Sequence, residues 1–166
     1  MTALLNEDDL GAVIRAHIYL ERDIDRVISL IVHNPDYIEK MTMDFSIKLK
    51  LAIALGMDEE IYKPLVSITH IRNKFAHDLS MKLNKSDINN FYKSFIPEDQ
   101  SAIQSIISDN EDRPYGLVKK FSLLTVKEKF VVMVFYLATR VTDELRQEIN
   151  FAIEGFEDAQ LSKQDA

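Results

Sequence analysis

The sequence predicts an all-α protein, a single-domain bundle of about five to seven helices. Apolar residues recur at three- and four-residue steps along most of the chain. Only four Gly and four Pro occur among 166 residues, too few for a turn-rich all-β fold. The length is that of one domain and suffices for a sizeable core. We expect residues 1–156 to form this domain and residues 157–166 to form a frayed polar tail.

The first helix is expected from about Glu7 to His33. Its apolar stripe consists of Leu10, Val13, Ile14, Ile18, Ile24, Val27, Ile28 and Ile31. His17, Glu21 and Asp25 lie partly along the same stripe. A carboxylate in that position needs a partner, because burying it alone costs several kcal/mol.

Two further helices precede residue 80. Asp44 is predicted to cap the segment DFSIKLKLAIALG, which Gly56 ends in a left-handed conformation. Lys48 and Lys50 are expected on its solvated face. A third segment, DEEIYKPLVSITHIRNKFAH, starts at Asp58. Pro64 either kinks its first turns or marks the true first turn after a short lead-in.

The C-terminal half is predicted to contain two short helices and one long one. The short helices are SDINNFYKSF and EDQSAIQSII, and the exposed loop SDNEDRPYG follows them. The long helix begins at Thr125, which forms a capping box with Glu128, and runs to about Phe156.

Composition excludes several classes of protein. A formal net charge of −7 disfavours a broad nucleic-acid surface, so sequence-specific DNA binding is not expected. The absence of Cys excludes disulfides, thiolate catalysis and Cys-based zinc sites, and it fits a cytoplasmic location. The longest apolar run, FVVMVFYLA, has nine residues, whereas a membrane span needs about 20, so no membrane segment is expected. No metal or other cofactor is expected either, because the four His lack zinc-like spacing.

The candidate site lies in HIRNKFAHDL, at the end of the third segment. Arg72, Asn73 and His77 offer a fixed cation, an amide and an imidazole, which together can hold a phosphate and move a proton near neutral pH. The structural alternative is a polar helix end, in which His77 stabilises the helix dipole and Arg72 pairs with Glu21 or Asp25. Spacing alone favours the structural alternative.

A locally basic stretch is the candidate for a second anion-binding surface. Its basic residues are Arg113, Lys119, Lys120, Lys127 and Lys129. Such a run is most often a solvated loop followed by a helix start.

The segment SIKLKLAIALG, followed by IRNKFAHD, resembles the mannitol operon repressor family and, more broadly, the HEPN superfamily of small helical domains. The hallmark of that superfamily is Arg, four to six residues, then His, which Arg72 and His77 match, with Asn73 in the expected second place. The opening LGAVIRAHIYLERDID also resembles the first helix of these proteins, in which an acid faces the motif helix. Glu21, or alternatively Asp25, is the equivalent acid. The resemblance covers residues 10–79.

The resemblance implies a dimeric helical bundle in which the two motif helices meet. In catalytic relatives this pairing forms a composite, metal-independent ribonuclease site of the toxin or defence type, with His77, Arg72 and Asn73 as its catalytic residues. Other relatives are regulators that act through protein partners. The acidic composition favours a regulator of transcription or stress response, and the intact motif keeps an RNA-cleaving enzyme as the alternative. A structural dimer sealed by the motif is the third hypothesis.

Overall fold

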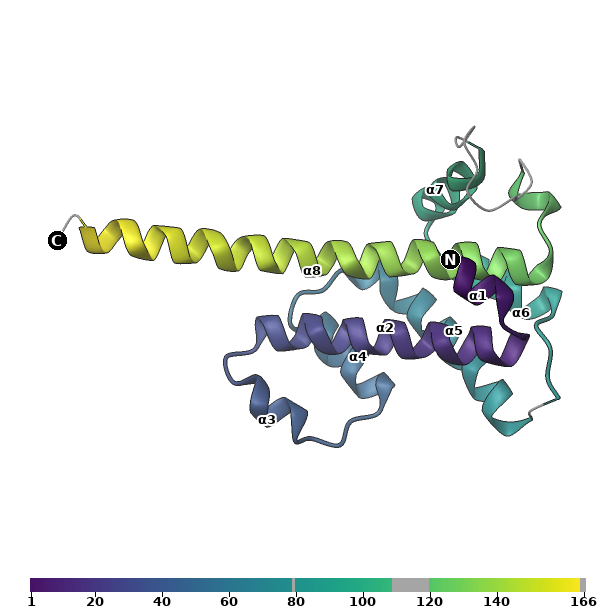
Figure 1. Cartoon of the computed structure of the whole chain (residues 1–166), viewed down its shortest axis with the longest axis horizontal. Coiled ribbons are helices and arrows are strands. Elements are labelled where there is room, and N and C mark those ends of the chain that lie inside the picture. The colour runs from purple at the N-terminus through teal and green to yellow at the C-terminus, as the bar shows by residue number, and fades with distance from the viewer. Residues whose placement is uncertain (79, 109–119, 165–166) are drawn as a thin grey trace.

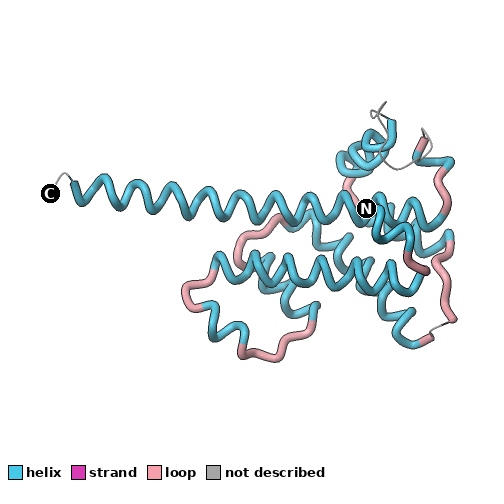
Figure 2. The backbone as a smooth tube through the Cα atoms, viewed as in Figure 1, coloured by secondary structure: helices cyan, strands magenta, loops and turns pink. Residues whose placement is uncertain are grey.

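The computed structural model describes residues 1–78, 80–108 and 120–164, and in this part of the chain every regular element is helical. The elements are α1 (Thr2–Asn6), α2 (Asp9–Ile31), α3 (Pro35–Glu39), α4 (Phe45–Ala54), η1 (Glu59–Ile61), α5 (Tyr62–His77), α6 (Lys85–Ser94), α7 (Pro97–Ser108), η2 (Phe121–Leu123) and α8 (Val126–Gln164). Figure 2 shows the helices and the loops between them. The predicted all-α single-domain bundle is confirmed. Two of the eight α-helices in these ranges, α1 and α3, have only five residues each, too few for an apolar period to mark them.

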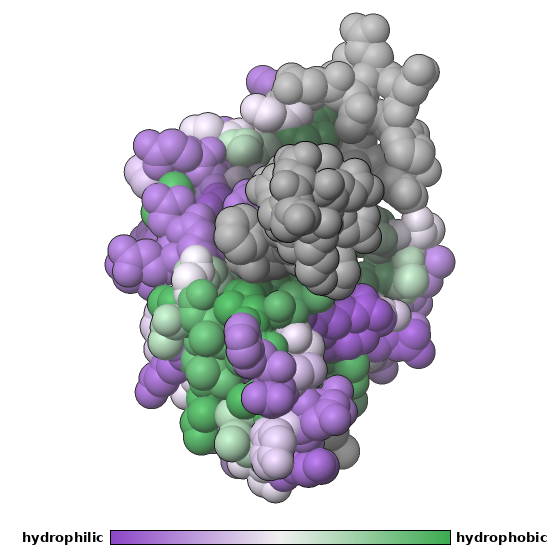
Figure 3. All heavy atoms as spheres, turned by 90° about the vertical axis from the view of Figure 1, so that its left-hand side faces the viewer, coloured by the Kyte–Doolittle hydropathy of each residue, from purple (hydrophilic) through white to green (hydrophobic). Residues whose placement is uncertain are grey.

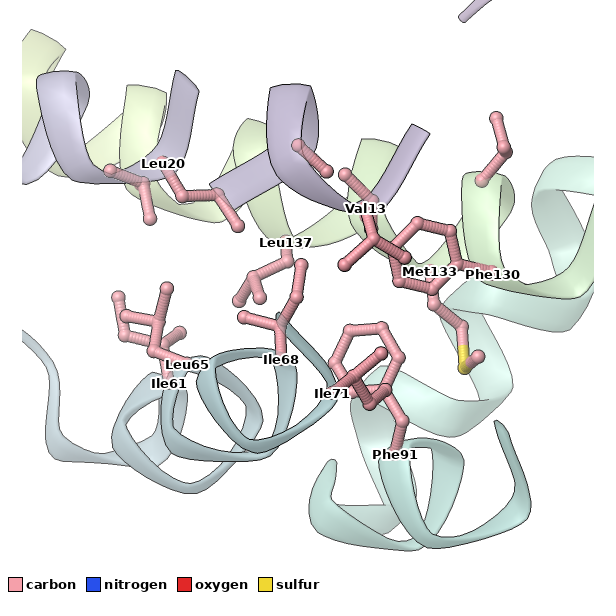
Figure 4. Close-up of a cluster of buried hydrophobic side chains, with 14 of the residues drawn as sticks. Val13, Leu20, Ile61, Leu65, Ile68, Ile71, Phe91, Phe130, Met133 and Leu137 are labelled. Atoms are coloured by element: carbon pink, nitrogen blue, oxygen red, sulfur yellow. The ribbon is translucent and has the colours of Figure 1, made fainter. Parts of the chain in front are cut away.

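The core lies around α2, which runs beside α8 along the long axis of the molecule (Figure 1). Helices α4 and α5 pack on α2 as well, and α6 joins α5 and α8. Figure 4 shows apolar side chains from α2, η1, α5, α6 and α8 gathered in one cluster of the core. They include Val13, Leu20, Ile61, Leu65, Ile68, Ile71, Phe91, Phe130, Met133 and Leu137, all 3% exposed or less.

Capping side chains set the starts of α2 and α4. The Asp8 carboxylate accepts a hydrogen bond from the Gly11 backbone N–H at 2.6 Å, and Asp44 accepts one from Ile47 at 2.9 Å. Gly56, with φ +114°, turns the chain after α4 in a conformation that only Gly adopts without strain. The predicted cap at Asp44 and the predicted left-handed Gly are confirmed.

The starts of α5 and α8 also follow from local sequence. Pro64 is the third residue of α5, where a missing N–H removes no helical hydrogen bond, so it marks the first turn rather than a kink. The capping box is present: the Thr125 N–H donates to Glu128 Oε2 at 2.7 Å, and the Glu128 N–H donates to Thr125 Oγ1 at 3.2 Å.

Arg140 of α8 joins three parts of the chain. Its guanidinium donates to Asp99 at the start of α7 and to Asp58 before η1, and lies 3.5 Å from the Glu60 carboxylate. The Tyr136 hydroxyl donates to the same Asp99 oxygen at 2.5 Å. Burial and this hydrogen bond raise the pKa of Tyr136, although the charge of Arg140 opposes the shift. Burial alone would lower the pKa of Arg140, but its interactions with Tyr136, Asp99 and Asp58 outweigh burial and raise it.

Helix α8 continues past the expected end near Phe156 to Gln164. Figure 1 shows its C-terminal part projecting well beyond the other helices. The assignment of residues 157–166 as a frayed tail stays a prediction. In the described part of the chain, no helix is both long enough and apolar enough to cross a membrane.

We predict that Arg140→Ala lowers the free energy of unfolding by about 3 kcal/mol, because it leaves the Asp99 carboxylate, with a side chain 3% exposed, without its cation. Urea denaturation monitored by circular dichroism measures this loss. Arg146→Ala is the matched control: Arg146 pairs with Asp143 on the same helix, but its side chain is 72% exposed, so the change should stay within about 0.5 kcal/mol. Equal effects of the two substitutions would contradict a structural role for the ion pairs of Arg140 with Asp58 and Asp99.

Candidate functional site

The motif predicted from HIRNKFAHDL occupies the last turns of α5. Ile71 and Phe75 are buried and hold this part of the helix on the core, whereas Arg72, Asn73 and His77 are exposed. The helix ends at His77, as predicted, and the backbone of Asp78 is extended. The three candidate catalytic residues therefore lie on the surface at the end of a well-anchored helix.

The structure brings two of these residues together. Arg72 Nη1 donates to Asn73 Oδ1 at 3.1 Å. Because α5 stays helical through His77, the side chains of residues 72 and 77 leave it about 140° apart. Among the described residues, no hydrogen bond or ion pair joins His77 to Arg72 or Asn73. One chain therefore does not assemble all three groups, and a site that uses them together needs a second copy.

The two acids on the α2 stripe have a different partner from the expected one. Lys48 of α4 donates to Glu21 at 2.9 Å and to Asp25 at 2.8 Å. Its side chain is only 17% exposed, so the expectation of a solvated Lys48 was wrong, whereas Lys50 is exposed as expected. Burial alone would lower the pKa of Lys48, but hydrogen bonds to the two carboxylates and their charges raise it. The acids thus join α2 to α4, and their predicted role in supporting Arg72 stays untested.

His17 is the residue of this region that the sequence analysis did not select. It is 5% exposed, and its ring lies 4.6 Å from the Phe45 ring, measured between centroids. Its Nε2 lies 3.4 Å from Thr69 Oγ1, and its Nδ1 lies 3.8 Å from Glu21 Oε2. The Thr69 hydroxyl donates to the Leu65 carbonyl at 2.8 Å, so its oxygen is left to accept from Nε2–H of His17.

The charge around His17 links it to the motif. Burial lowers the pKa of His17; Glu21 opposes this shift, and the positive charge of Arg72 adds to it. Arg72 therefore lies close enough to α2 for its charge to act there. The sequence did indicate that His17 has a special position, because His17 and Glu21, four residues apart, interrupt an otherwise apolar stripe.

The middle of the motif has a structural role. Lys74 donates to Asp87 of α6 at 2.5 Å, and the Asn84 side-chain amide donates to the other Asp87 oxygen at 2.7 Å. Asp87 is 9% exposed. This pair attaches α6 to the helix that carries Arg72.

The basic stretch is only partly described. Arg113 and Lys119 lie outside the described residues. Lys120 is exposed, Lys127 donates to the Glu7 backbone carbonyl, and the Lys129 amine lies 5.7 Å from the centroid of the Phe121 ring. Two of the three described lysines thus have contacts within the chain, which fits a solvated helix start better than a prepared anion site.

Comparisons with models of known protein families, with curated proteins and with solved structures found no match to this chain. The resemblance to the mannitol operon repressor family therefore stays a prediction that rests on the motif residues.

We predict that Lys48→Ala lowers the free energy of unfolding by about 1–2 kcal/mol, because it removes the link between α2 and α4 and leaves two carboxylates facing each other. Glu21→Ala should cost less, since Lys48 keeps Asp25. Thermal and urea unfolding measure both changes. Lys50→Ala is the matched control on the exposed face of α4 and should have no measurable effect.

We also predict that the free energy of unfolding depends on the protonation of His17. In the unfolded chain His17 has its ordinary pKa of 6.5, whereas the folded protein accepts the proton only at lower pH. The contribution of neutral His17 to stability is thus complete above pH 6.5 and is lost as the pH falls towards the lowered folded pKa. Unfolding curves above and below this pH should show a smaller pH dependence for His17→Gln than for wild type. His33→Gln, at an exposed residue, should keep the wild-type pH dependence.

Proposed function

We propose that this protein is a cytoplasmic, dimeric regulatory module that acts on transcription or a stress response through a protein partner. One observation carries the proposal: Arg72, Asn73 and His77 are exposed at the end of α5, and Asn73 accepts a hydrogen bond from Arg72 at 3.1 Å, which orients the guanidinium. An exposed, oriented Arg is a frequent anchor of protein–protein contacts. We call the surface that carries these three residues the motif face.

The distribution of charge supports a protein partner over direct reading of DNA. The chain has a net charge of −7. Lys48, Lys74 and Arg140 are each bound to carboxylates within the fold, so their charges are largely neutralised. A DNA-binding surface needs several free cations directed at phosphates.

A metal-independent endoribonuclease is the second candidate, because His77 is open to solvent at the helix end and Arg72 is oriented by Asn73. In that function His77 would activate the ribose 2′-hydroxyl or protonate the leaving oxygen. Arg72 would stabilise the charge on the phosphate, and Asn73 would position it. The divergence of residues 72 and 77 within one chain means that this function requires the motif faces of two copies to meet.

One experiment separates the two candidates. Purified wild type, Arg72→Glu and Lys50→Glu are immobilised and crosslinked to extract from the source cells, and the same proteins are incubated with mixed RNA and a chelator. A regulator leaves the RNA intact and recovers a defined protein, with about tenfold less recovered by Arg72→Glu and no loss for Lys50→Glu. RNA cleavage by the wild type that is abolished in His77→Ala would overturn the proposal in favour of the nuclease.

A further inference from the structure

A cleft with a volume of about 640 Å³ opens where α4, η1, α5 and α6 meet. Its described walls come from the end of α4, from η1, from the start of α5, and from the end of α6 with the segment that leads to α7. Helix α5 packs on both α4 and α6, so these walls are neighbouring parts of one bundle. Sites that bind small molecules have volumes of roughly 300–1,000 Å³. The cleft is therefore large enough for a small ligand.

One part of the lining is apolar and is held in place by the core. Phe95 is 3% exposed, and Ile53 and Tyr62 are half-buried and pack on the core. Ile96, which follows Phe95 in the chain, is half-buried as well. Because these side chains are already packed, they offer apolar contact to a ring or a branched chain without first having to become ordered. We call Ile53, Tyr62 and Phe95 the apolar wall of the cleft.

Two cations of the same lining, Lys63 and Lys93, have no partner in the described part of the chain. Neither makes a hydrogen bond or an ion pair there, although Glu59 and Glu60 also line the cleft. Glu60 lies 3.5 Å from the Arg140 guanidinium, so its charge is largely compensated within the fold. The charges left over in the described lining are two positive and one negative. The cleft therefore attracts an anion of low charge rather than a polyphosphate.

Ser94 adds a hydrogen-bond acceptor to the lining. Its hydroxyl donates to the Phe91 carbonyl at 2.6 Å, so its oxygen is left to accept a hydrogen bond. The oxygens of an ionised carboxylate or phosphate only accept, so an anionic group binds the ammonium groups of Lys63 and Lys93 rather than Ser94. A hydroxyl or amino group on the ligand suits Ser94.

We propose that this cleft binds a small organic anion, in which an aromatic or branched apolar body carries a carboxylate or a phosphate monoester. The apolar body lies on the apolar wall, and Lys63 and Lys93 bind the anionic group. Lys63 is the second residue of α5, and Arg72 follows nine residues later, about 14 Å further along the helix axis. The ligand site is therefore separate from the motif face and does not depend on which partner that face binds.

Anilinonaphthalene sulfonate, an aromatic anion that becomes fluorescent in apolar sites, is a suitable probe because the chain contains no Trp. We expect Lys63→Glu combined with Lys93→Glu to weaken dye binding at least about tenfold, because the anion loses both cations. Both lysines are exposed, so circular dichroism should show an unchanged fold. Lys50→Glu combined with Lys85→Glu is the matched control. It makes the same change in net charge at exposed residues that do not line the cleft, and it should bind the dye like the wild type.

Competition for the bound dye identifies the class of ligand. Phenylacetate and phenyl phosphate carry the two kinds of anionic group on the same ring, and at least one of them should displace the dye. The more effective one shows whether the site takes a carboxylate or a phosphate monoester. Benzyl alcohol, which has the ring without the charge, and inorganic phosphate, which has the charge without the ring, should not compete. Equal dye binding by the wild type and the Lys63/Lys93 variant, or equal competition by benzyl alcohol, would overturn the proposal.

Amide chemical shifts locate the bound anion independently of the dye. This control is needed because dyes also bind open hydrophobic surface, and Figure 3 shows such an area at the end of the molecule towards which α8 projects. Addition of phenylacetate or phenyl phosphate to isotope-labelled protein should shift the amides of residues 59–63 and 93–96 and leave those of residues 72–77 unchanged. Shifts confined to residues 72–77 would place the anion on the motif face and rule out the cleft, whereas the proposed protein-binding function would stand.

Discussion

The burial of one side of α2 is the constraint on which the rest of the structure depends. α4, α5 and α8 all pack on this helix, and Ala12, Val13, Ala16, Ile24, Val27 and Ile28 are completely buried. Burial of apolar area provides the main driving force for such a bundle. The same helix carries His17, Glu21 and Asp25 at the margin of its buried side, so the packing that stabilises the fold also brings polar groups out of water. Lys48 of α4 binds the two acids, and Thr69 of α5 contacts His17.

Two cations of the fold each bind more than one acid. Lys48 binds Glu21 and Asp25, and Arg140 binds Asp58 and Asp99. Each cation reaches residues distant in sequence, so each pairing also fixes how helices are placed relative to one another. Coulombic attraction compensates for desolvation only with such close geometry. One Asp99 oxygen, Oδ2, is nevertheless buried without a hydrogen-bond partner among the described residues.

The ion pairs inside the fold determine which cation of the motif is free at the surface. Lys74, although it lies inside the motif, is committed to Asp87, so Arg72 is the guanidinium that the motif presents outward.

The sequence by itself determined the longer helices and several of their ends, because these depend on contacts between near neighbours: Asp44 with Ile47, Thr125 with Glu128, and the left-handed turn at Gly56. It also placed Arg72, Asn73 and His77 at the end of one helix. Only the tertiary structure decided that Lys48, rather than an Arg, pairs with Glu21, and that His17 is buried against Phe45 and Thr69. Those pairings join residues 27 to 52 positions apart in the chain. Helical periodicity predicts which side of a helix is buried, but the partner of a polar group depends on how two helices are placed against each other, which no local pattern encodes.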